Sequence, residues 1–156
     1  EYGEERFARR MAGAVIRERA VKPITGTVQL AGLLAAAHPA WERGRHPATK
    51  AFQGIRIFIN RELDDLEDLL AQVIDTLKVG GRLVIISFHS LEDRRVKRFI
   101  RDQEQGVKLP KNLPVRDLDR GVRLVKVGKA IKPAVSEVDG NVRSRSAVMR
   151  VAERVA

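Results

Sequence analysis

The chain has 156 residues, of which 44% are hydrophobic, and this is enough for one domain or for parts of two. Its 30 Lys and Arg against 20 Asp and Glu give a net charge of +10, which favours a polyanionic partner and nucleic acid first. The absence of Cys excludes disulfides and Cys-ligated metal sites. The sequence has no long apolar run and no signal-peptide pattern, so we expect a cytoplasmic protein without a membrane partner.

Apolar residues at helical spacing predict four helices in the first half of the chain. They are expected over 3–20, from Thr25 or Thr27 as the cap to about Ala37, from Pro47 as the first residue through Ile59, and from Leu63 to Leu77. Between the second and third helices, a basic loop carries Trp41, which either stacks on a nucleic-acid base or fills a small helical core.

A buried parallel strand is predicted after Gly80-Gly81, because the residues up to Ile86 are apolar on both faces instead of alternating. The strand ends in a polar cluster, and we expect Ser90 to cap a helix over 91–105. Glu92 and Asp93 stand in its first turn, where carboxylates suit the helix dipole. Polar residues at the carboxyl end of a strand in an α/β sheet indicate a ligand crevice.

The rest of the chain predicts a loop and two strands. Residues 106–121 contain Pro and Gly and are expected to be loop, whereas Val122–Val127 and Ser146–Ala152 are expected to pair as an antiparallel ribbon. This ribbon can cover one edge of the central strand, but the other edge has no partner in the sequence. We therefore expect the chain to be the C-terminal portion of a longer protein.

Four runs of residues, in collinear order over essentially the whole chain, closely resemble the bacterial 16S ribosomal RNA cytosine-N4 methyltransferases, the RsmH or MraW family. The runs are Tyr2-Gly3-Glu4-Glu5-Arg6-Phe7-Ala8, His46-Pro47-Ala48-Thr49-Lys50-Ala51-Phe52-Gln53, the stretch 80–94, and Arg143-Ser144-Arg145-Ser146-Ala147-Val148-Met149-Arg150.

The resemblance implies an α/β fold: the later half of a class I S-adenosylmethionine methyltransferase (Rossmann-like) sheet plus part of a helical inserted domain. Residues 1–50 would belong to the inserted substrate-recognition domain, and 51–156 to the methyltransferase domain ending in the antiparallel strand pair. The implied partner is 16S ribosomal RNA in the small subunit, and a homodimer is also expected. The family's Gly-rich first loop is not in this sequence, so we expect S-adenosylmethionine to bind mainly outside it and the isolated chain to be inactive.

The polar turn after the strand holds the first candidate site. Phe88 is placed to stack on a cytosine, unless it is a core residue, and Ser87, His89 or Ser90 can bond the edge of the base. His89, with Ser87 second, is the candidate for a general base, although a bond that shapes the turn is the favoured role for His89.

Polar and basic side chains elsewhere are candidates for RNA contact. One polar face at the start of the third helix is predicted to contact RNA, or else to serve in capping and a domain interface; it comprises His46, Thr49, Lys50, Gln53 and Arg56. A second set is the basic surface containing Arg94, Arg98 and Arg145, to which Arg143 and Arg150 can add, although one of these can pair with an acidic neighbour instead.

Other functions receive less support from the sequence. A non-catalytic RNA-binding or ribosome-associated module is the main alternative, and a DNA-binding helical protein is weaker because no plain helix-turn-helix pair is present. A Ser–His hydrolase lacks a Gly-x-Ser-x-Gly elbow. His38 and His46 have no carboxylate cluster to complete a metal site, so no metal is expected.

Overall fold

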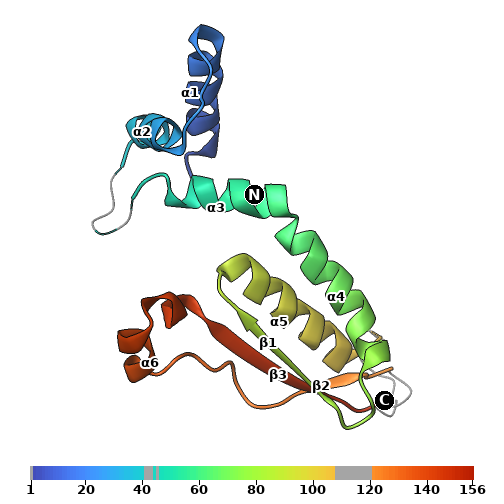
Figure 1. Cartoon of the computed structure of the whole chain (residues 1–156). Helices are drawn as coiled ribbons and strands as arrows, with labels where there is room; N and C mark the ends of the chain where they lie inside the picture. Colours follow the sequence, from blue (N-terminus) through green and yellow to red (C-terminus); the bar gives the residue numbers. More distant parts are fainter. Residues whose placement is uncertain (1, 41–43, 45, 108–120) are drawn as a thin grey trace. The chain divides into compact units, whose positions relative to one another are not determined.

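The computed structural model describes residues 2–40, 44, 46–107 and 121–156. The chain divides into two compact units, Glu1–Glu62 and Leu63–Ala156, each of which has its own core (Figure 1). The predicted roles of Trp41 fall outside the described residues, as does most of the predicted loop 106–121.

The first unit is helical and contains α1 (Ala8–Val21), α2 (Thr27–Ala37) and α3 (Thr49–Asn60). Its core is small and is built from side chains of α1 and α2 and from the turn before α3: Met11, Ala14, Leu34, Ala37 and Ala48. Three details differ from the predictions. The first helix begins at Ala8, the cap of α2 is Gly26 without a side-chain bond, and Pro47 lies in a turn before α3.

The segment before α1 lies against α3. A Cβ atom added at Gly3 would collide with the backbone oxygen of Lys50, and Gly54 allows the same close approach from the side of α3. The rings of Tyr2 and Phe58 lie with their centroids 6.0 Å apart. Gly3 is therefore required by the close packing of two backbone segments.

The second unit combines a sheet with helices. It begins within α4 (Glu62–Thr76), which is followed by β1 (Arg82–Ser87), α5 (Ser90–Gln105) and β2 (Leu124–Lys126). Then α6 (Val135–Gly140) and the 3-10 helix η1 (Val142–Ser146) lead into β3 (Val148–Arg154). The strand order is β1-β3-β2, and β3 pairs antiparallel with both neighbours. Figure 1 shows α4 and α5 beside this sheet.

The core of the second unit lies between one face of the sheet and the two long helices. Each strand contributes one inward side chain, and the helices contribute three: Leu83, Leu124 and Ala152 from the sheet, with Ile74, Val96 and Ile100 from α4 and α5. Arg154 at the end of β3 donates to the carbonyl oxygens of Ile74 and Leu77, at 2.6 and 2.5 Å. These bonds satisfy the last carbonyls of α4, a role suited to a cation.

The prediction of a strand buried on both faces is wrong for this chain. Burial alternates along β1, and Val84 and Ile86 on the outer face remain 53% and 54% exposed. The physical reason is that the helices that form the core pack on the other face of the sheet, so the outer face has no cover among the described residues. The second edge of β1 is open there as well, because β1 pairs only with β3, antiparallel. The predicted antiparallel ribbon of the last two strands is confirmed, whereas α6 was not predicted.

Among the described residues, no helix has both the length and the apolar character that a membrane crossing requires.

Candidate functional site

The carboxyl end of β1 presents a short polar turn between the sheet and α5. Ser87 is buried there, and Phe88 follows with 56% of its surface exposed. His89 is the N-cap of α5, in extended backbone conformation. The predicted core role for Phe88 is therefore not what this chain shows, since an aromatic ring at this turn is open to solvent.

The turn is held by a capping box formed by His89 and Glu92. Nδ1 of His89 accepts the backbone N–H of Glu92 at 3.4 Å, and the Glu92 carboxylate accepts the N–H groups of Phe88 and His89 at 2.9 and 3.3 Å. The second ring nitrogen, Nε2, lies 3.3 Å from the same carboxylate. The prediction that Ser90 caps the helix is thus wrong: Ser90 is the first residue inside α5, because the imidazole of His89 already occupies the capping position.

A bidentate ion pair joins the first turn of α5 to the sheet. Nε and a terminal amine of Arg150, in β3, donate to the two oxygens of Asp93 at 2.7 and 2.9 Å. Both side chains are about four-fifths buried, at 21% and 22% exposure. The hydrogen bonds that Arg150 donates to Asp93, together with the negative charge of Asp93, raise the pKa of the Arg150 guanidinium against the opposing effect of burial. The expectation that one of the late arginines pairs with an acidic neighbour is confirmed at Arg150.

The basic residues of α5 divide into paired and unpaired groups. Arg95 donates to Glu67 at 2.7 Å, and Arg101 bonds its neighbour Asp102 at 2.9 Å. Arg94 and Arg98 are exposed on the helix, and Lys97 and Arg98 have no ion pair within the described part of the chain. Arg145 is exposed in η1. The charge available to a polyanion on α5 is therefore smaller than the sequence alone indicates.

The predicted polar face of α3 separates into residues with different roles. Nδ1 of His46 accepts the N–H of Ala48 at 3.2 Å and its carbonyl accepts the N–H of Thr49 at 3.0 Å, so His46 shapes the turn before the helix. Arg56 makes a two-pronged ion pair with Glu62, at 2.7 and 2.9 Å.

Three members of that face remain for contact with a ligand. Thr49 is exposed, whereas Lys50 and Gln53 are half-buried. Their contact with RNA stays a prediction, as does every other role of a site residue.

Comparison with known proteins agrees with the order of motifs along the chain. The model of the MraW methylase family matches residues 1–155. Relatives named "Ribosomal RNA small subunit methyltransferase H" occur in Marinomonas sp. (strain MWYL1) at 59% identity, in Chromohalobacter salexigens at 59% and in Legionella pneumophila (strain Paris) at 54%. Each alignment covers 99% of this chain but only 50%, 47% and 50% of the relative. The chain thus spans about half the length of the curated relatives it matches.

Replacing Asp93 by Asn is expected to destabilise the second unit by about 1–3 kcal/mol, because Arg150 would keep a largely buried charge with a weaker acceptor. Denaturation in urea measures this change. Asp102→Asn is the matched control, since its pair with Arg101 is exposed and worth about 0–1 kcal/mol. Equal stability of the two variants would contradict a structural role for the Asp93–Arg150 pair.

His89→Ala is expected to cost about 1 kcal/mol of stability through loss of the cap, whereas His89→Asn is expected to stay close to the parent because Asn is a favourable N-cap. The unfolding midpoints of the two variants provide the measurement. If Asn were as destabilising as Ala, capping would not be what His89 contributes.

Proposed function

The chain belongs to the MraW methylase family, and from this premise we propose that it is the C-terminal half of an enzyme that methylates N4 of a cytosine in 16S ribosomal RNA with S-adenosylmethionine. The match of the family over residues 1–155 is the observation that carries the proposal. The names of the relatives support a small-subunit RNA substrate, and with such a substrate the protein would act in the cytoplasm. A homodimer remains a prediction.

The chemistry of the reaction gives the turn after β1 its proposed role. The exocyclic amine of cytosine is a poor nucleophile because its lone pair is delocalised into the ring, so holding it in line with the methyl group supplies much of the rate gain. The base must also be unstacked from its neighbours before it can reach an active site. Phe88 offers an exposed ring on which that base can stack, and the capping box holds the turn in place.

The residues of this chain do not by themselves fit a complete donor site. A nucleoside donor needs acceptors for its ribose hydroxyls, but both carboxylates at this turn are engaged: Glu92 bonds backbone N–H groups, and Asp93 bonds Arg150. A Gly-rich strand–helix loop is also absent from the sequence. We therefore propose that S-adenosylmethionine is held mainly by residues outside this chain, and we assign no step of donor binding to the residues present.

The open side of β1 supports a larger sheet. Val84 and Ile86 are exposed on its outer face, and β1 has a strand partner on only one edge among the described residues. In a doubly wound, Rossmann-like sheet a further strand would pair with the open edge, and crossover helices would cover the outer face. In this proposal residues 1–50 belong to an inserted, RNA-recognising domain, and 51–156 belong to the catalytic domain.

The proposal is tested by methyl transfer to small ribosomal subunits that lack the modification. Full-length protein with radiolabelled S-adenosylmethionine is expected to label 16S RNA, and nucleoside analysis is expected to yield N4-methylcytidine. The chain 1–156 alone is expected to transfer nothing, because it lacks the acceptors described above. Failure of the full-length protein would leave the alternative, an RNA-binding module without catalysis. Transfer by the chain alone would refute the assignment of the donor to another part of the protein.

Phe88→Ala in the full-length protein is expected to lower kcat/KM about 5- to 150-fold, since stacking on one base is worth about 1–3 kcal/mol. Phe88→Tyr keeps the ring and is expected to stay within a few-fold of the parent. Both variants should unfold at the parent's midpoint, because the ring is mostly exposed. Parent-level activity in the Ala variant would rule out stacking by Phe88.

A further inference from the structure

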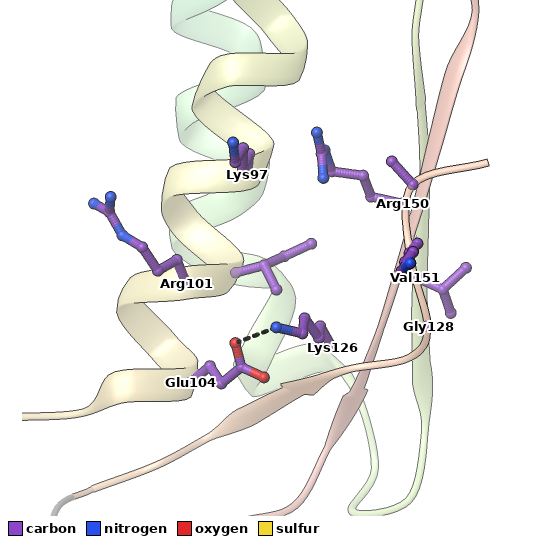
Figure 2. Close-up of a pocket in the computed structure, with 10 residues that line it drawn as sticks. Lys97, Arg101, Glu104, Lys126, Gly128, Arg150 and Val151 are labelled. Carbon is purple, nitrogen blue, oxygen red and sulfur yellow. Dashed lines mark ion pairs between the residues drawn. The ribbon is translucent and has the colours of Figure 1, made fainter. Parts of the chain in front are cut away.

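A second concave site lies along the later half of α5, away from the turn that follows β1. It is a pocket of about 370 Å³ between α5, the end of β2 and the middle of β3, shown in Figure 2. This volume lies within the range of about 300–1,000 Å³ that small-ligand pockets occupy. From Ser90 at its start to Arg101 in the pocket, α5 extends about 16 Å, at about 1.5 Å per residue.

An irregularity in strand pairing builds one wall of the pocket. The N–H of Val127 donates to the carbonyl of Val151 at 2.8 Å, and Ile131 and Met149 exchange two backbone bonds at 2.9 and 2.8 Å. Residues 128–130 therefore bulge out opposite the single residue Arg150. Because both ends of the bulge are bonded to β3, Lys129 is held at the rim of the pocket.

The lining is strongly basic. It contains one carboxylate, that of Glu104, and five cationic side chains, which are Lys97, Arg101, Lys126, Lys129 and Arg150. These cations come from α5, β2, the bulge and β3, so residues far apart in sequence converge on one hollow. Figure 2 shows Lys126 and Arg150 between α5 and the strands and Lys97 on α5, whereas the guanidinium of Arg101 is directed away from the strands.

Ion pairing leaves a surplus of positive charge in this pocket. Asp93 neutralises Arg150, Asp102 bonds Arg101, and Glu104 reaches Lys126 only at 3.8 Å. Lys97 and Lys129 make no ion pair with any acidic residue in the part of the chain that is described. Two ammonium groups, each with three donors, therefore meet at the same hollow without an anionic partner among the described residues.

We propose that this pocket binds a phosphate group in the backbone of single-stranded RNA. This proposal rests on the proposed function, which supplies RNA as the partner. The pocket would add a second contact with the RNA, about 16 Å along α5 from the turn proposed to receive the base. No aromatic side chain is among the described residues that line the pocket, so a base has nothing to stack on. The site therefore fits the phosphate and not the nucleobase, and the contact is independent of sequence.

Binding of fluorescent single-stranded RNA to the full-length protein, measured over a series of salt concentrations, tests the proposal. The double variant Lys97→Gln/Lys129→Gln is expected to bind about tenfold more weakly. Its slope of log affinity against log salt is expected to fall by about 0.7, because one phosphate contact with a single strand is lost. Lys78→Gln/Lys132→Gln removes the same charge from exposed positions outside the pocket, and is expected to show less than half of either effect.

The same variants in the methylation assay separate failure of the pocket from failure of the proposed function. An increase in KM for RNA at unchanged kcat is expected for the pocket variant. If the parent binds and methylates RNA but the pocket variant matches the control variant, the pocket proposal is overturned. If the parent binds RNA with the expected dependence on Lys97 and Lys129 but methylates nothing, the pocket stands and the proposed function is overturned. Absence of RNA binding by the parent overturns the pocket.

Discussion

The ion pair between Asp93 and Arg150 fixes the position of α5 on the sheet, and both candidate sites depend on that position. Arg150 lies in β3, the central strand of the three, and its two bonds of 2.7 and 2.9 Å hold the first turn of α5. On one side of the pair lies the capping-box turn that presents Phe88. On the other side lies the basic pocket, of which Arg150 is itself part of the wall. A single largely buried ion pair thus positions both the turn that presents Phe88 and the proposed phosphate site.

Ion pairing decides which part of the net charge of +10 can act on a ligand. Arg56, Arg95 and Arg123 each bond a carboxylate at 2.6–2.7 Å, so their charge is largely compensated where it stands. Such exposed pairs add about 0–1 kcal/mol to stability, but they strongly reduce the local field. The ammonium groups of Lys97 and Lys129, which have no ion pair within the described part of the chain, come from distant parts of the sequence and meet only in the folded chain. In the proposed function, these two groups give RNA a positively charged contact beside α5.

Local signals in the sequence predicted the helices and the strand well, and long-range features poorly. Periodic apolar residues located α4 and α5 to within a few residues, because one buried stripe determines such helices. The cap was assigned to Ser90 because Ser is a common N-cap, and only the fold shows that His89 and Glu92 close the box. The placement of the final ribbon at one edge of β1 was predicted, but not that β3 is the strand that pairs with β1 or that it runs antiparallel to it. The bulge at 128–130 was not predicted either, since it too depends on partners distant in the sequence. The pocket proposed to bind phosphate was missed for the same reason.

The disagreement over β1 links the fold to the proposed function. Its apolar run predicts burial on both faces, yet Val84 and Ile86 are exposed on a strand with one paired edge. At about 25 cal/mol per Å² of apolar surface, burying these side chains would favour the packing of helices on this face. A further strand would pair with the open edge, which would favour aggregation if left uncovered. The pattern of β1 is thus consistent with a strand inside a larger parallel sheet. In that setting the turn holding Phe88 would face the same crevice as the ends of the added strands, where the proposed donor site would lie.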